Sequence, residues 1–104
     1  MSSALPVAVN AAGDDFVTAH FFVQARAEAG VMPRVLELFA KRGLVPQRWH
    51  SVITGPGNGA LTIDIETGTL GREAIDYVAH CMRQIVGVDT VLTAIAGAAE
   101  ARPG

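Results

Sequence analysis

Apolar and polar residues alternate along several stretches of the chain, and this period of two predicts β-strands. In residues 17–25, Phe21 and Phe22 make both sides apolar, so we expect a central strand. Residues 46–54 form a second strand, and Pro46, which cannot donate a ladder hydrogen bond, indicates that it lies at an edge. Residues 60–66 alternate regularly and need cover on one face only. A fourth strand is expected over residues 88–95.

Two other stretches repeat their apolar residues at three- and four-residue spacing, which predicts amphipathic helices. The first begins after Gly30 and stops at Gly43; its apolar residues are Val31, Met32, Val35, Leu36, Leu38 and Phe39. The second covers about residues 72–85, with Thr69 and Gly71 expected in a capping loop before it. Its apolar residues are Ile75, Val78, Ala79, Met82, Ile85 and Val86.

The order of these elements is βαββαβ, which predicts an α+β fold of the ferredoxin-like type. Its four-stranded antiparallel sheet carries both helices on one face and leaves the other face uncovered. We expect one domain over residues 16–96, a flexible N-terminal segment over residues 1–15 and a flexible tail over residues 97–104. Because the strands at 17–25 and 88–95 are apolar on both sides, the open face or an edge of the sheet should meet a partner.

Composition adds to this picture. The chain has 104 residues, of which 50% are hydrophobic and 17% charged. That is one domain's length and rather apolar for a small monomer, so we expect a homodimer or higher homo-oligomer. The lone Cys81 excludes an internal disulfide and fits a reducing cytoplasm, where it packs as a small apolar side chain. No apolar run reaches the roughly 20 residues that span a bilayer, and the N-terminus lacks a secretion signal, so we expect a cytoplasmic protein without membrane contact.

The candidates for chemistry are weak. The formal net charge of −2 gives no field for phosphate backbones, and Phe22 and Trp49 lack the basic residues that accompany aromatic side chains on RNA-binding sheets, so we expect no nucleic-acid partner. Asp64 and Glu66 share one strand face, but no His or metal ligand accompanies them in the sequence. The three histidines, His20, His50 and His80, lack metal-ligand spacing. We therefore expect no catalytic residue, no metal site and no cofactor.

The run from Gly30 to Leu44, GVMPRVLELFAKRGL, resembles the signature of ACT domains, and most of all that of the small regulatory subunit of acetolactate synthase. In order, the matching residues are Gly30, Arg34, Val35, Leu38, Phe39, Arg42 and Gly43. The segments 60–66 and 82–91 resemble the third strand and the end of the second helix in the same family. Since the resemblance covers about residues 17–95, the chain is similar to the short form of that subunit.

The resemblance implies a non-catalytic regulatory module that pairs side by side and binds a small amino acid at the seam between two copies. The ligand would lie against the loop before the first helix, and the start of the second strand of the neighbouring copy would close the site. The implied ligand-binding residues are Ala27, Glu28, Ala29, Gly30, Val31, Met32, Val45 and Pro46. Backbone N–H groups near Gly30 would take the carboxylate, in keeping with the preference of helix N-termini for anions.

Family members that sense valine resemble one another in an Asn at each of two positions that Ala27 and Val45 occupy here. We therefore expect weak valine binding and a role in supporting a catalytic large subunit, with Arg34, Arg42 and Trp49 as interface anchors. Two other function classes stay open. One is a free-standing sensor of an amino acid or small carboxylate, and the other is a small dimeric ferredoxin-like enzyme with a cavity beneath the open face.

Overall fold

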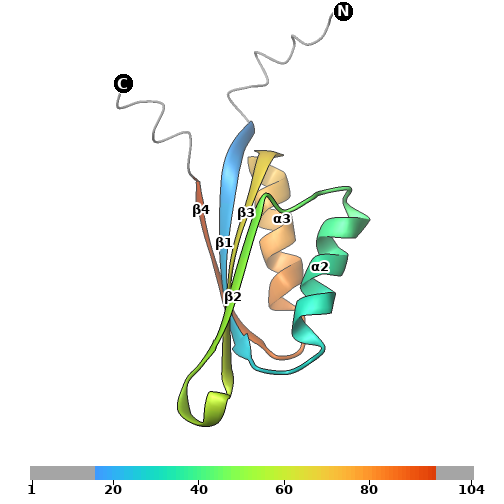
Figure 1. Cartoon of the computed structure of the whole chain (residues 1–104). Coiled ribbons are helices and arrows are strands. Elements are labelled where there is room, and N and C mark those ends of the chain that lie inside the picture. Colours follow the sequence, from blue (N-terminus) through green and yellow to red (C-terminus); the bar gives the residue numbers. More distant parts are fainter. Residues whose placement is uncertain (1–15, 96–104) are drawn as a thin grey trace, which may run out of the picture.

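The computed structural model describes residues 16–95, which form four strands and two helices in the order βαββαβ (Figure 1). The strands are β1 (Phe16–Arg26), β2 (Arg48–Thr54), β3 (Ala60–Gly71) and β4 (Val88–Ile95), and the helices are α2 (Val31–Lys41) and α3 (Arg72–Arg83). A short 3-10 turn, η1 (Pro56–Asn58), connects β2 to β3. This order confirms the predicted ferredoxin-like fold. The segments expected to be flexible, 1–15 and 97–104, lie outside the described residues.

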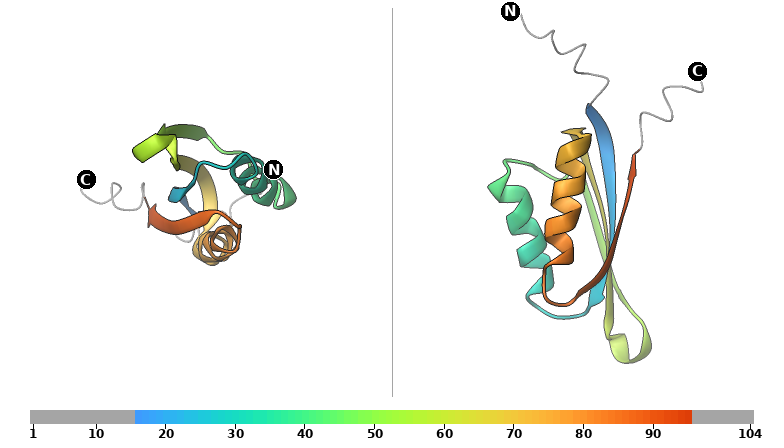
Figure 2. Two further views of the ribbon diagram at one scale, coloured as in Figure 1. Left: turned by 90° about the horizontal axis from the view of Figure 1, so that it is seen from below. Right: turned by 180° about the vertical axis from the view of Figure 1, so that it is seen from behind.

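All strand pairs are antiparallel, and the strand order is β2-β3-β1-β4. The central position of β1 and the edge position of β2 were both predicted from the sequence. Both helices cover the same face of the sheet, and no element of the described chain covers the other face (Figure 2). We call this uncovered side the open face.

The core lies between the helices and the sheet. The inward-facing residues of β1 and β3 are buried, and Phe21, Ile63 and Ile65 among them are at most 1% exposed. From α2, Val31, Val35 and Phe39 pack onto them, and the rings of Phe21 and Phe39 meet edge to face with centroids 6.0 Å apart. The buried residues of α3 are Ile75, Val78, Ala79 and Met82. These four belong to the stripe that the helical spacing predicted.

Two residues assigned to apolar stripes are exposed. Leu36 of α2 is 45% exposed because the helix buries a narrower side than its sequence pattern suggested. Val86 is 75% exposed because α3 ends at Arg83, which places Val86 beyond the last turn that packs on the sheet.

The start of α3 also differs from the prediction. β3 continues through Gly71, so residues 67–71 form strand and not the expected capping loop. They pair with the beginning of β1 across an irregular register, and the side chains of Thr67 and Leu70 are buried there. Gly71 is the N-cap residue of α3 and no side chain caps this helix.

The end of α2 is a Schellman turn, as the glycine stop predicted. Gly43 has a φ of 69°, a conformation that glycine adopts without steric cost. Its N–H donates to Ala40 O at 3.0 Å, and the N–H of Leu44 donates to Phe39 O at 2.8 Å. The chain then enters β2 at Arg48, two residues later than the sequence suggested.

Candidate functional site

The loop between β1 and α2, residues 27–30, is anchored to the turns on both sides of it. We call it the ligand loop. The N–H of Arg26 donates to Gly87 O at 2.8 Å, and the N–H of Ala27 donates to Gly59 O at 3.0 Å. Within the loop, the N–H of Val31 donates to Glu28 O at 3.1 Å. These bonds fix the loop at one end of the sheet, directly before the first turn of α2 (Figure 1).

Several backbone N–H groups of this loop and of the first turn of α2 stay available. Among residues 16–95, those of Ala29, Gly30 and Met32 have no backbone acceptor, and no side chain caps α2. Unpaired N–H groups at a helix N-terminus, together with the positive end of the helix dipole, favour an anionic ligand. Free N–H donors therefore lie at the start of α2, and the binding of a carboxylate there stays a prediction.

Arg34 adds a positive charge to the same place. Its Nη1 donates to Gly30 O at 3.1 Å, so the guanidinium lies over the first turn of α2. A guanidinium carries five N–H donors, and this bond leaves most of them available. In the sequence analysis Arg34 was an interface anchor, but the structure places its guanidinium beside the ligand loop.

The backbone at position 30 does not itself require glycine. Gly30 has φ −81° and ψ −8°, a right-handed conformation open to any residue. The absence of a side chain at Gly30 leaves room for Arg34, because a Cβ on Gly30 would collide with Nη1 of Arg34. Glycine therefore allows the guanidinium to approach the backbone.

Glu28 brings a negative charge to the edge of the loop. Its Oε2 lies 3.4 Å from Nε of Arg26, and both side chains are about half exposed or more. The carboxylate also rests against Gly87, whose added Cβ would lie 2.9 Å from Oε1 of Glu28. The ion pair with Arg26 offsets part of the repulsion that this carboxylate exerts on an anionic ligand.

The other two predicted ligand residues lie elsewhere. Val45 and Pro46 follow the C-terminal end of α2, whereas the loop precedes its N-terminal end. A helix of 11 residues separates the two groups by about 16 Å at 1.5 Å per residue. Val45 is 78% exposed. One copy of the chain therefore does not bring the two halves of the predicted site together.

Comparison with known proteins agrees with the fold and identifies the family. Residues 12–99 match the family model of an ACT-like domain, which is most of the chain. The chain belongs to the ACT-like domain family. ACT-type domains are generally regulatory and non-catalytic. The chain is an ACT-type regulatory domain. No curated protein sequence matches it significantly.

Solved structures share the fold of this ACT-like domain. The ACT domain of GTP pyrophosphokinase from Chlorobium tepidum is similar with a TM-score of 0.64 and 13% identity, covering 76% of this chain and 99% of that one. The C-terminal domain of the MgtC protein from Mycobacterium tuberculosis has a TM-score of 0.64 and 12% identity, with 79% and 89% covered. The regulatory subunit of aspartate kinase from Thermus thermophilus has a TM-score of 0.60 and 12% identity, with 77% and 52% covered.

The remaining interface candidates of the ACT-like domain lie on its helix side. The guanidinium carbon of Arg42 lies 4.1 Å from the centroid of the Tyr77 ring, a cation–π contact that connects α2 to α3. Trp49 is half-buried and packs against the core, opposite Ile65 on the helix-covered face. Cys81 is a half-buried free thiol beside Leu38, Tyr77 and Arg42. Arg42 and Trp49 thus each make contacts within the chain.

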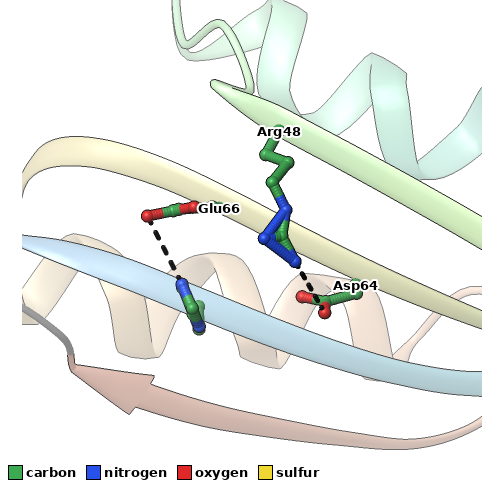
Figure 3. A network of polar contacts seen from close by, with 4 residues as sticks. Arg48, Asp64 and Glu66 are labelled. Atoms are coloured by element: carbon green, nitrogen blue, oxygen red, sulfur yellow. Dashed lines mark hydrogen bonds and ion pairs between the residues drawn. The ribbon is translucent and has the colours of Figure 1, made fainter.

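Sequence reasoning missed a polar cluster on the open face (Figure 3). Nη2 of Arg48 donates to Oδ2 of Asp64 at 3.3 Å, and Nε2 of His20 lies 3.5 Å from Oε2 of Glu66. The alternation placed Asp64 and Glu66 on one face, but their partners on β1 and β2 follow only from the strand register. Among residues 16–95, no group of three or more His, Cys, Asp or Glu side chains is placed to hold a metal ion.

Both helices of the described chain are short. They have 11 and 12 residues, and neither has the length and apolar character needed to cross a membrane.

Proposed function

We propose that this ACT-like domain is the small regulatory subunit of acetolactate synthase, and that it pairs side by side with a second copy through β2. One observation carries the proposal. The ligand loop and the segment Val45–Pro46 lie at opposite ends of α2, so only a second copy completes the site that the family signature implies. The run Gly30–Leu44, which resembles the signature of that subunit, supports this choice of enzyme.

The two edges of the sheet differ in their suitability for pairing. On β4, the backbone acceptor Val91 O is already bound by Nη2 of Arg83 at 2.7 Å. On β2, no side chain of the described residues bonds to the backbone. Exposed, unpaired strand edges are templates for another strand. The edge of β2 is therefore the better candidate for a continuous sheet across two copies.

Antiparallel pairing of two β2 strands would also bring the ligand loop of one copy close to Val45 and Pro46 of the other. β2 ends at Thr54, which pairs with Ala60, and Ala60 pairs with Arg26 just before the ligand loop. The end of β2 and the ligand loop thus lie at the same end of the sheet. In an antiparallel pair, the start of β2 in the second copy, with its Val45 and Pro46, would lie beside the end of β2 and the ligand loop of the first copy. Each seam would then hold two equivalent sites, each built from both copies.

The proposed ligand is a small amino acid, and its binding would be weak. The N–H groups of Ala29, Gly30 and Met32 would hold its carboxylate. Ala27 and Val45 offer no amide side chain to orient the ligand. We therefore propose that the domain acts mainly by contact with the catalytic large subunit.

Reconstitution tests this proposal. The full chain is added to the purified catalytic large subunit of acetolactate synthase from the same cell, and acetolactate formation is measured. A regulatory subunit that contacts the active conformation more favourably raises turnover, because a partner shifts an equilibrium only by its differential affinity. Bovine serum albumin at equal concentration is the control for nonspecific stabilisation. Unchanged turnover would contradict the assignment to acetolactate synthase.

A second candidate is a free-standing sensor of a small carboxylate. The guanidinium of Arg34, bonded to Gly30 O beside the unpaired N–H groups, favours this candidate because it adds charge to the carboxylate site. A sensor binds its ligand without any enzyme partner. Calorimetric binding of a small amino acid, together with no effect on acetolactate synthase, would favour it over the first proposal.

A further inference from the structure

We propose that Arg83 closes the outer edge of β4 to strand pairing, and that this edge pairs with a second copy of the chain when the guanidinium is removed. The outer edge of β4 is the side that faces away from β1, and we call it the β4 edge. The inference goes beyond the proposed regulatory function and does not rest on it, because that function uses the ligand loop and β2.

Two hydrogen bonds at the end of β1 show which way its backbone groups point. The N–H of Arg26 donates to Gly87 O, on the β4 side of the strand. The N–H of Ala27, the next residue, donates to Gly59 O, on the β3 side. Backbone groups alternate in direction along a strand. Over residues 20–26, even-numbered residues therefore direct their backbone groups to β4, and odd-numbered residues direct theirs to β3.

The register transfers this alternation to β4. Val91 lies opposite Val23, and Thr93 lies opposite Phe21. Since these two residues of β1 direct their backbone groups to β3, Val91 and Thr93 direct theirs away from β1. The contact with Arg83 agrees, because its Nη2 reaches Val91 O at 2.7 Å. Val91 and Thr93 thus present N–H and C=O groups that a strand pairing at the β4 edge would need.

Arg83 occupies the middle of the β4 edge. The strand runs from Val88 to Ile95, so Val91 lies near its centre. α3 lies beside β4 (Figure 2), and Arg83, its last residue, extends its guanidinium to Val91 O in a part-buried hydrogen bond. A charged donor binds a carbonyl more strongly than the neutral N–H of an approaching strand does. Strand pairing here would have to displace the stronger donor.

Charge is a second obstacle to pairing at this edge. Antiparallel pairing of two β4 strands along their full length places Val91 of both copies near the two-fold axis. The two Arg83 guanidinium groups would then lie close together. Among residues 16–95, no carboxylate forms an ion pair with Arg83. Two like charges facing each other across an interface disfavour association.

The two edges of the sheet also differ in regularity. The register of β4 shifts between Val88 and Thr90, so Asp89 between them has no partner on β1. Asp89 is exposed. Bulges and charged side chains are features that disfavour pairing at an exposed edge. β2, in contrast, keeps an unbroken register with β3 over its whole length. The irregularity of β4 is therefore a second observation that separates the two edges.

Closing one edge determines how large an assembly can become. Symmetric pairing through a single edge ends at two copies, whereas symmetric pairing through both edges extends the sheet without closing. If two copies pair through β2, a β4 edge lies at each end of their common sheet. Arg83 then stops further growth at both ends.

Sedimentation velocity of the full chain over a range of concentrations tests this inference. Arg83→Met removes the guanidinium and keeps an unbranched side chain. Arg72→Met is the control for the lost charge, because Arg72 lies in the first turn of the same helix. Ile75→Val is the control for lost stability, because it truncates a side chain of α3 that is 2% exposed. Circular dichroism melting verifies that each variant folds.

We expect Arg83→Met to reach roughly twice the wild-type mass or more as its concentration rises, while both controls keep the wild-type mass. Adding Thr93→Pro to Arg83→Met should restore the wild-type mass. Proline at this position removes an N–H that points to the β4 edge and leaves the bonds to β1 in place.

Three results would overturn the inference: a folded Arg83→Met that keeps the wild-type mass at every concentration, growth that Ile75→Val shares, or growth that Thr93→Pro does not reverse. A monomeric wild type together with a dimeric Arg83→Met would support the role of Arg83 and contradict pairing through β2. The role of Arg83 and the pairing through β2 are therefore tested separately.

Discussion

Arg34 is the residue at which the sequence signature and the ligand loop coincide. It belongs to the run that resembles the acetolactate synthase subunit, and its guanidinium bonds to Gly30 O. We predict that Arg34→Glu abolishes activation of the catalytic subunit. The fold should persist, because the side chain is exposed and an acidic residue near the start of a helix is favourable.

The matched control for Arg34→Glu is Arg72→Glu, which makes the same charge change in the first turn of α3. Turnover of the reconstituted enzyme and the thermal midpoint of each free variant are measured. Activation by Arg34→Glu at the wild-type level would show that this side chain contributes neither to the partner contact nor to the ligand site.

Arg83 has a structural role that its position in the sequence did not reveal. Its bond to Val91 O, at 2.7 Å, is part-buried and connects the last turn of α3 to the edge strand β4. We predict that Arg83→Met lowers the free energy of unfolding by about 1–2 kcal/mol, because the carbonyl loses a charged donor. Arg72→Met, at a side chain without such a bond, should stay within about 0.5 kcal/mol of wild type. Urea unfolding measures both, and equal stabilities would contradict this role.

At the scale of elements, the turn before β4 supports the ligand loop. Gly87 has a φ of 99°, its carbonyl accepts the N–H of Arg26, and an added Cβ would lie 3.0 Å from Cγ2 of Val31. We predict that Gly87→Ala costs about 1–3 kcal/mol of unfolding free energy, since backbone strain and crowding act together.

Gly59→Ala is the control for Gly87→Ala in the opposite turn. Gly59 has a φ of −95°, and its added Cβ would come no closer than 3.4 Å to Pro56 O. The loss of unfolding free energy caused by Gly59→Ala, measured by urea titration, should be small. If both variants lose the same free energy of unfolding, the positive φ of Gly87 does not contribute to the stability of the ligand loop.

The elements also show what the sequence could and could not predict. Periodicity located both α-helices and all four strands of the described chain, because each one turns one side toward the same core. It missed the extension of β3 over residues 67–71, since Gly68 and Gly71 read locally as a loop and only the pairing with β1 makes them strand. The Arg48–Asp64 pair was missed for the same reason, because two residues 16 positions apart meet only through the register.

The candidate site was predictable only in part. The free N–H groups before α2 follow from a local pattern, the start of a helix after a glycine. The separation of Val45 and Pro46 from that loop is a property of the folded chain, and so is the guanidinium of Arg34 over Gly30. The expectation that a neighbouring copy supplies Val45 and Pro46 came from the family resemblance and not from the periodicity of the chain.

For the whole molecule, we predict weak binding of valine. Ala27 and Val45 lack two amide groups, and each lost hydrogen bond to a charged group costs about 1.5–3 kcal/mol, which together is a factor of hundreds or more. Titration calorimetry should show no dissociation constant below about 1 mM. Val45→Asn, at a side chain that is 78% exposed, should tighten binding. A micromolar constant for the wild type would show that these amides are unnecessary.

The claim that two copies form one site is tested most directly by cross-linking. Cys81 is replaced by Ala, and Ala29→Cys and Val45→Cys are introduced into separate chains, which are mixed and treated with a short bis-maleimide. Within one chain the two positions lie about 16 Å apart along α2, too far for a direct bridge. Side-by-side pairing predicts a covalent heterodimer from the mixture and much less from either variant alone. A mixture that stays monomeric on a denaturing gel would contradict the shared site.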